Sequence, residues 1–316
     1  MGDKGQASGL QDVNKPGLSG NIKGALLLAL SGVGFTIYLL LNKLMSADVH
    51  PVLLAFWRAF FGMVLAVPFV MHVGFHVMRT RRPGLLVLRS LFGTLGFTLA
   101  IIAVSDLYSV TLAQFNAISF TRPLFVTLLA ALILREVVGV QRWGAVLVGF
   151  IGVLVMVVPG VFMFWQPGAM DGFDFDMGSG WALLSAFSLA AAIVLVKFLS
   201  GELSAMALLL YANFFSTIIL SPFLFFYWDN FSLQMWAMIV AMSFVGFVSQ
   251  YCYIAAMSAG EASFISPVDY LRLPMSAVAD FAVFRLVPGF NVLVGALIII
   301  VSTLYIGWRE RLKGRP

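Results

Sequence analysis

Long apolar runs separated by short polar turns cover almost the whole chain. Each run is close to the ~20 residues that an α-helix needs to cross a ~30 Å hydrocarbon core. The pattern therefore predicts an all-α integral membrane protein with ten transmembrane helices. The predicted helices lie at about residues 22–45, 51–75, 84–104, 109–134, 141–158, 180–199, 204–227, 233–257, 261–284 and 290–308.

Composition supports this class. The chain is 61% hydrophobic and 10% charged, whereas soluble proteins carry roughly 25% charged residues. A net charge of +5 would suggest nucleic acid in a soluble protein, but here the basic residues lie in short loops and tails. One cysteine and three histidines leave no intrachain disulfide and too few ligands for a dedicated metal site. We therefore expect no cofactor, no metal and no nucleic acid partner.

The basic residues predict the orientation in the membrane. With a cytoplasmic N-terminus, fourteen of the 19 Lys and Arg residues face the cytoplasm, Arg89 among them, and only Lys43 and Arg285 face outward. Three more, Arg58, Arg122 and Arg272, fall inside predicted helices. Cytoplasmic loops are enriched in Lys and Arg, so both termini are predicted to be cytoplasmic.

An internal repeat divides the chain. Adding 154 takes Pro68-Phe69 to Pro222-Phe223, and adding 150 takes Arg122 to Arg272. The helix between these segments follows an offset of 153. Each half holds five predicted helices, an odd number, so the second half must be inverted in the membrane, as in many secondary transporters.

The repeat and the loops divide the chain into five expected parts. Residues 1–21 form a disordered cytoplasmic tail and 161–179 an external loop. Residues 22–160 form the first repeat and 180–308 the second. A basic cytoplasmic tail covers residues 309–316.

The helix predicted at 261–284 carries charges within an apolar run. Arg272 falls near its midpoint, with Asp269 three residues earlier on the same face. Such charges usually face a bundle interior or a wet cavity. Ser266 and Tyr270 share the stripe and complete a candidate substrate-binding surface. The alternative is a structural ion pair that fixes the packing of the two halves.

Arg122 occupies the equivalent place in the first half and has no acid on its own face. It either pairs with Asp269 across the halves or meets an anionic group of a substrate. Asn116 and Ser119 lie on the same polar stripe, which favours a cavity lining over lipid contact.

Other polar residues in apolar runs have two interpretations. Thr98, Gln250 and Tyr251 are candidates for substrate contact, or they join helices by hydrogen bonds worth ~0.6 kcal/mol each. Arg58 is close enough to a helix end to extend to the outer interface. Asp280 is expected to pair with Arg285.

Two segments carry a family resemblance. Residues 129–160, LAALILREVVGVQRWGAVLVGFIGVLVMVVPG, resemble the end of an EamA domain of the drug/metabolite transporter superfamily. Residues 264–288, FISPVDYLRLPMSAVADFAVFRLVP, are similar to a stretch of a bacterial branch described as S-adenosylmethionine-type or riboflavin-type permeases. One departure is that Glu136, part of the EamA pattern, becomes Leu286 in the second half.

The resemblance implies two inverted five-helix EamA repeats. It implies a permease of the bacterial inner membrane that moves riboflavin, S-adenosylmethionine, an amino-acid-like solute or another small metabolite by alternating access. Its partners would be the solute and the lipid bilayer, with a homodimer left open. The alternatives are an intramembrane enzyme, for which no catalytic motif is apparent, and a receptor or assembly subunit that does not transport.

Overall fold

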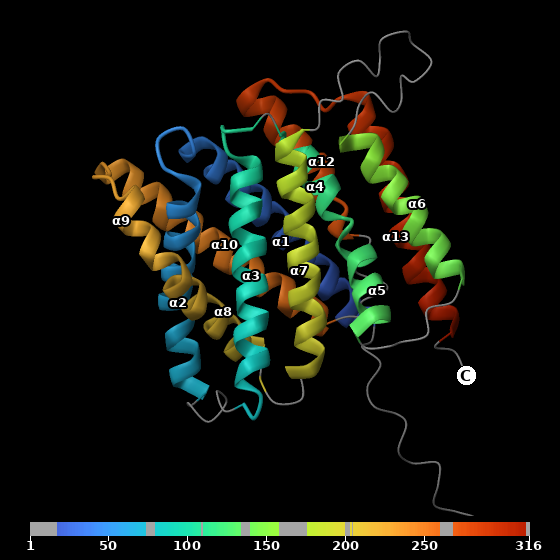
Figure 1. Ribbon diagram of the computed structural model, residues 1–316, viewed down its shortest axis with the longest axis horizontal. Helices are drawn as coiled ribbons and strands as arrows, with labels where there is room; N and C mark the ends of the chain where they lie inside the picture. The colour runs from blue at the N-terminus through green and yellow to red at the C-terminus, as the bar shows by residue number, and fades with distance from the viewer. Residues whose placement is uncertain are drawn as a thin grey trace, which may run out of the picture.

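The computed structural model describes residues 18–73, 80–108, 110–133, 140–157, 176–199, 203, 205–259 and 268–313. All regular elements of these residues are helices, and most run side by side (Figure 1). The helices of the first half are α1 (Leu18–Met45), α2 (Pro51–Val73), α3 (Pro83–Val104), α4 (Leu112–Ser119), α5 (Arg122–Ile133) and α6 (Val140–Val157). Those of the second half are α7 (Met177–Leu199), α8 (Ala205–Leu220), α9 (Leu224–Tyr227), α10 (Leu233–Ala259), α12 (Arg272–Ala279) and α13 (Phe290–Lys313). A 3₁₀ turn (Ser221–Phe223) joins α8 to α9, and a π-helix (Asp280–Phe284) follows α12.

Several element ends differ from the predicted parts. Helix α1 begins at Leu18 inside the expected tail, α7 begins at Met177 inside the expected loop, and α13 continues to Lys313.

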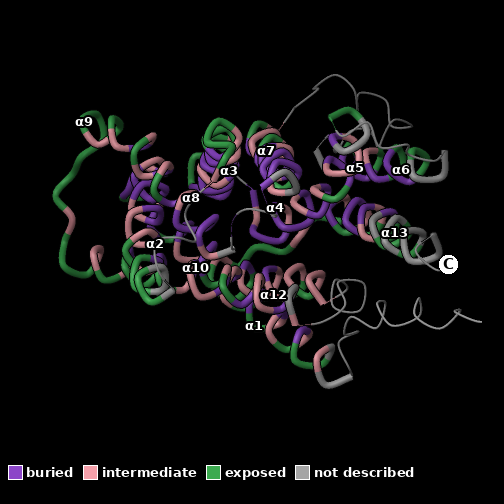
Figure 2. Tube along the Cα trace, turned by 90° about the horizontal axis from the view of Figure 1, so that it is seen from below, coloured by how far each residue is buried: buried purple, intermediate pink, exposed green. Residues whose placement is uncertain are grey.

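Six of the described helical segments are long and apolar enough to cross a bilayer, which makes the chain a multi-pass membrane protein. They are 22–45, 51–68, 83–104, 177–196, 206–227 and 233–256. Helices α6 and α13 hold shorter apolar segments, Trp143–Val155 and Phe290–Ser302. Leu26 and Leu147 are 68% and 63% exposed, as suits a lipid-facing surface, whereas buried residues lie on faces that the helices turn toward one another (Figure 2).

The packing partners stay the same when the two halves are exchanged. Helix α1 packs on α10 as its repeat equivalent α7 packs on α3, and α1 meets α12 as α7 meets α5. Helices α2 and α8 pack against each other as equivalents, and so do α6 and α13, while α4 packs on α12. This is the pattern that two similar repeats related by a pseudo-two-fold axis produce.

Both helices that carry the central arginines are broken, which corrects the prediction of continuous helices at 109–134 and 261–284. A turn at Phe120–Thr121 separates α4 from α5, and a turn at Tyr270–Leu271 precedes α12. The offset of 150 relates these two turns. The rings of Phe120 and Tyr270 meet edge to face with centroids 4.7 Å apart, so the equivalent turns meet between the halves.

One end of α4 is held by the second half. The Asp280 carboxylate accepts the backbone N–H groups of Leu112 and Ala113, at 3.1 and 2.9 Å. Lys43 Nζ donates to the neighbouring Val110 carbonyl at 3.0 Å. Asp280 therefore caps a helix of the other repeat, because the N–H groups at a helix start lack partners within the helix. The expected pair with Arg285 is not formed within the described part of the chain, where Asp280 binds Leu112 and Ala113 instead.

Candidate functional site

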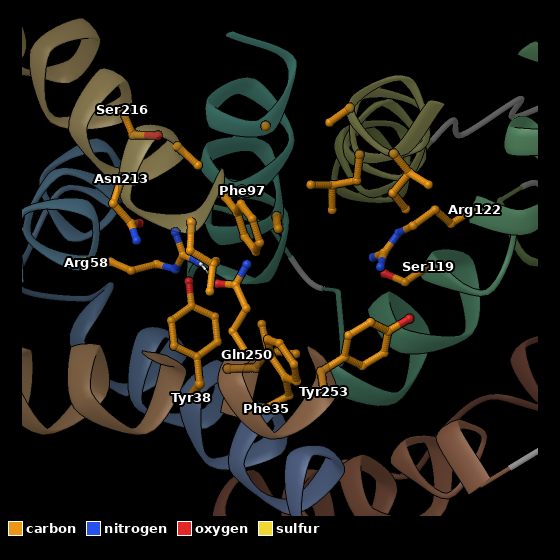
Figure 3. Close-up of a pocket in the computed structure, with 18 of the residues that line it drawn as sticks. Phe35, Tyr38, Arg58, Phe97, Ser119, Arg122, Asn213, Ser216, Gln250 and Tyr253 are labelled. Carbon is orange, nitrogen blue, oxygen red and sulfur yellow. Dashed lines mark hydrogen bonds between the residues drawn. The ribbon is translucent and has the colours of Figure 1, made fainter. Parts of the chain in front are cut away.

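A cavity of ≈ 200 Å³ lies between the two halves. Its lining comes from helices α1, α2, α3, α4, α5, α7, α8, α10 and α12. Both repeats therefore contribute to its wall. Arg58 lies at one end of the cavity and Arg122 at the other (Figure 3).

Much of this wall is built from equivalent positions of the repeat. The offsets found in the sequence relate seven pairs of lining residues. These pairs are Phe35 and Leu189, Tyr38 and Ala192, Leu39 and Ile193, Arg58 and Ala212, Phe97 and Gln250, Ala100 and Tyr253, and Arg122 and Arg272. The cavity thus lies where the pseudo-two-fold relation between the halves would place a shared site.

Arg58 lies in the cavity wall, not at the outer interface as expected. It is 8% exposed, and its Nη2 donates to Gln250 Oε1 at 3.2 Å. Its guanidinium carbon lies 3.9 Å from the centroid of the Phe97 ring and 5.7 Å from that of Tyr38. The inward position is favoured because two aromatic faces and an amide oxygen receive the cation.

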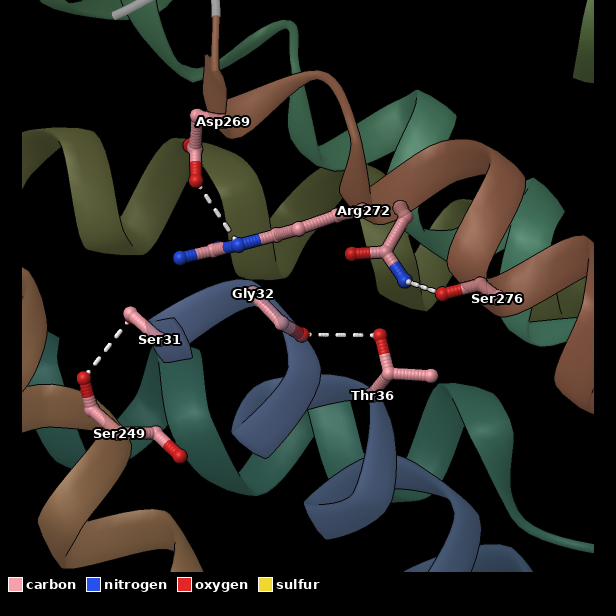
Figure 4. A network of polar contacts seen from close by, with 8 residues as sticks. Ser31, Gly32, Thr36, Ser249, Asp269, Arg272 and Ser276 are labelled. Carbon is pink, nitrogen blue, oxygen red and sulfur yellow. Dashed lines mark hydrogen bonds and ion pairs between the residues drawn. The ribbon is translucent and has the colours of Figure 1, made fainter. Parts of the chain in front are cut away.

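Arg272 has the expected acid partner. Its Nε lies 2.8 Å from Asp269 Oδ1, as Figure 4 shows. Neither atom meets hydrogen-bond geometry, so this contact is an ion pair without an aligned hydrogen bond. The guanidinium also lies 4.4 Å from the centroid of Phe35, and Arg272, unlike Asp269, lines the cavity.

Arg122 begins α5 and points into the cavity toward Ser119 (Figure 3). Its Nε is buried and has no hydrogen-bond partner among the residues that the structure describes. Among the described residues no acid pairs with it, so the expected alternative of a pair with Asp269 across the halves is not what the structure has.

Arg89 also lines the cavity, although the sequence placed it among the cytoplasmic residues. It belongs to α3, and its Nη1 donates to the Leu208 carbonyl of α8 at 3.3 Å. Its Nε is buried without a partner within the described part of the chain. Four arginines therefore face this cavity.

Three other predicted residues lie at the cavity. Ser119 and Gln250 line it. Asn116 lines it too, but its amide donates to the Leu112 carbonyl at 3.0 Å and to Ser276 Oγ at 2.8 Å. Asn116 thus also ties α4 to α12.

Three further predicted residues, which the structure describes, do not line the cavity. Tyr270 packs on Phe120, because the turn before α12 redirects it from the predicted stripe. Tyr251 is 44% exposed on the outer face of α10, and Thr98 lies one residue from the lining Phe97. Ser266 lies outside the described residues.

Sequence reasoning missed several lining residues, among them Arg58, Arg89, Asn213 and Tyr253. A signal was available for Tyr253, which is three residues from Gln250 and so shares its helix face. The repeat offsets give no such signal for Arg89 and Asn213, whose equivalents, Met242 and Ala59, are not among the described lining residues. No group of three or more His, Cys, Asp or Glu gathers among the described residues.

Apolar helices around a central polar cavity define the class as a multi-pass membrane protein with a solute-sized internal site. The model of the EamA-like transporter family matches residues 22–158 and 176–308, so the chain belongs to that family. This confirms the resemblance seen in the sequence.

Relatives of known name agree with this assignment. The chain is 30% identical over 293 residues to the S-adenosylmethionine uptake transporter of Rickettsia prowazekii, covering 92% of this chain and 94% of that protein. It is 28% identical over 302 residues to the riboflavin transporter of Vibrio cholerae, covering 93% and 96%. A solved crystal structure with a TM-score of 0.57 and 17% identity covers 90% of this chain and 98% of its own, which shows the shared fold. The protein is therefore a permease for a small metabolite and not an enzyme.

Proposed function

We propose that this protein is a secondary transporter that moves its solute across the bacterial inner membrane by alternating access. The observation that carries the proposal is the cavity between the halves, lined by seven pairs of repeat-equivalent residues. When two repeats enclose one site, rocking of one against the other exposes the site to either side in turn. The excess of basic residues in the predicted inner loops favours cytoplasmic termini.

The solute would bind between the central arginines. Arg122 and Arg272 contribute one charge from each repeat, Ser119 and Gln250 add hydrogen-bonding groups, and Arg58 extends the polar wall. Asp269 would orient Arg272 from behind the wall. Riboflavin, S-adenosylmethionine and amino-acid-like solutes are the starting candidates, because proteins named for the first two are relatives over nearly the full chain.

Uptake into vesicles tests this proposal. The purified protein would be reconstituted, and uptake of labelled riboflavin, S-adenosylmethionine and a panel of amino acids and organic acids measured with and without the same solute inside. Saturable uptake that internal solute accelerates is expected, because exchange uses the same alternating site. Arg122→Gln should abolish it, and Tyr251→Phe, on the exposed face, should retain it.

Two outcomes would contradict the proposal. Binding without any uptake across the whole panel would favour a receptor that does not transport. Uptake that never saturates and ignores Arg122→Gln would place the path outside this cavity.

A further inference from the structure

We infer that the solute is a small organic anion, with a carboxylate or phosphate group that Arg122 binds, and that the cavity disfavours cations. The inference rests on the proposed function, because it names the chemical class carried through the same site. Its starting point is the charge of the wall: Arg58, Arg89, Arg122 and Arg272 line the cavity, and no described lining residue is Asp or Glu.

The neighbouring carboxylate does not balance these charges. Asp269 lies behind Arg272 and pairs with it at 2.8 Å, which leaves three lining arginines without an acid among the described residues. Buried charges in proteins are normally paired, and charges at membrane depth are costly. An anion that enters the cavity would supply the missing counter-charge, whereas a cation would meet several like charges at short range.

The arginines also present free donors in the right arrangement. Arg58 stacks on Phe97 and Arg272 on Phe35, with guanidinium carbons 3.9 and 4.4 Å from the ring centroids. Stacking occupies the face of a guanidinium and leaves the N–H groups at its edge available. The planar fork of such donors matches the two oxygens of a carboxylate or phosphate.

Arg122 is the strongest candidate for the direct contact. Its buried Nε has no hydrogen-bond partner in the described part of the chain, and the Ser119 hydroxyl beside it can donate a further bond (Figure 3). Arg58 sits at the other end of the cavity with the amides of Asn213 and Gln250. The lining also includes Leu189, Ala192 and Ile193, which suits the apolar part of a solute.

The volume of the cavity narrows the class of solute further. At ≈ 200 Å³ the cavity is smaller than the roughly 300–1,000 Å³ pockets that hold drug-sized ligands. An acid about as large as an amino acid therefore fits better than a large cofactor-like molecule. The sulfonium cation of S-adenosylmethionine conflicts with the four arginines on charge.

Matched pairs of probes test charge separately from shape. Binding to purified full-length protein would be measured by calorimetry for phenylacetate and phenylacetamide, for riboflavin 5′-phosphate and riboflavin, and for S-adenosylhomocysteine and S-adenosylmethionine. The more negative member should bind at least about 10-fold more tightly in any pair that binds, because a buried charged contact contributes strongly to affinity. The first two pairs distinguish a carboxylate from a phosphate.

Variants assign the effect to the site. Arg122→Gln should remove the preference for the more negative probe of each pair. Arg122→Lys should still favour that probe but bind it more weakly, and Tyr251→Phe should leave the preference unchanged. Added salt should weaken the anionic member more than the neutral one, by a small factor because buried charge pairs are screened little, a readout that does not depend on any variant folding.

Three outcomes would overturn the inference. The first is tighter binding of S-adenosylmethionine than of S-adenosylhomocysteine. The second is binding of inorganic phosphate or chloride with no binding of any organic anion. The third is that no pair shows a preference, or that no probe of the three pairs binds. Uptake separates this test from that of the proposed function. Saturable uptake of a cation sinks only the anion inference, whereas anion binding without transport sinks only the transporter proposal.

Discussion

The two repeats place equivalent residues around one cavity but fill those positions with different side chains. The first half supplies Tyr38 and Arg58, where the second has Ala192 and Ala212. Among the described lining residues, Arg122 and Arg272 are the one pair of equivalent positions that is charged in both halves. The difference indicates that duplication determines where the cavity lies, whereas divergence of individual side chains determines what it binds. Even the retained arginines differ, because Ser119 stands where the second half has Asp269.

The largest expected effect is a loss of transport when either central arginine, Arg122 or Arg272, is replaced. Arg122→Gln and Arg272→Gln should each lower the transport rate by about 100-fold, since each removes a buried charge contact worth 2–5 kcal/mol. Only Arg272→Gln should also lower thermal stability, because it leaves Asp269 without its ion-pair partner. Vesicle uptake and thermal unfolding in detergent measure the two effects, and equal loss of stability in both variants would contradict this distinction.

A second prediction concerns the helices that pack on their own equivalents at one edge, α6 and α13 (Figure 1). A Cβ atom on Gly152 would lie 2.9 Å from the Gly295 carbonyl oxygen, whereas one on Gly144 would meet open space. Gly152→Leu should therefore destabilise the protein by about 1–3 kcal/mol through overpacking. Gly144→Leu is the matched control, and a comparable fall in its unfolding temperature would show that residue size alone, not this contact, is responsible.

A third prediction concerns moving a cavity-lining arginine from the first half to the equivalent position of the second half. Arg58→Ala should lower the affinity for the solute about 10-fold, as the loss of one charged hydrogen-bonding group predicts. Adding Ala212→Arg at the equivalent position should recover part of this loss, since both residues line the same cavity. Calorimetric titration of the two variants measures the recovery, and a double variant weaker than the single one would show that position matters more than total charge.

A smaller effect is expected where one repeat caps the other. Asp280→Ala removes both acceptors for the N–H groups of Leu112 and Ala113, and losing such a cap costs about 1 kcal/mol. The unfolding temperature should fall, while Arg285→Gln should leave it unchanged. A fall for Arg285→Gln as large as that for Asp280→Ala would revive the pair expected from the sequence.

The smallest effect is a dependence of stability on pH. His50 lies between α1 and α2 and stacks on Tyr227 with centroids 3.7 Å apart. Burial lowers the pKa of His50 below its ordinary value, so below about pH 6.5 the unfolded chain takes up a proton that the folded chain resists. Stability should therefore decline slightly as the pH falls from 7 to 5. His50→Gln should flatten this part of the curve, and an unchanged curve would exclude His50 as its source.

Local patterns in the sequence were sufficient for much of this fold. The apolar runs predicted a helical membrane protein, and the segments at 129–160 and 264–288 pointed to the family that the match over residues 22–158 and 176–308 confirms. The spacing of Asp269 and Arg272 predicted an ion pair, because i,i+3 positions share a helix face. The helix breaks were less accessible, because membrane helices also tolerate a proline such as Pro123 within a continuous span.

The sequence by itself determined the class, the family, the repeat and the two central arginines, because these follow from hydrophobicity, spacing and duplication along one chain. Only the tertiary structure decided that Arg58 and Arg89 join them, that Tyr253 and not Tyr251 faces the cavity, and that Asp280 caps α4. The physical reason is that a buried charge or polar group is satisfied by whatever the fold brings near it. Those partners, such as Phe97 for Arg58 or Leu112 for Asp280, come from other helices and leave no local pattern.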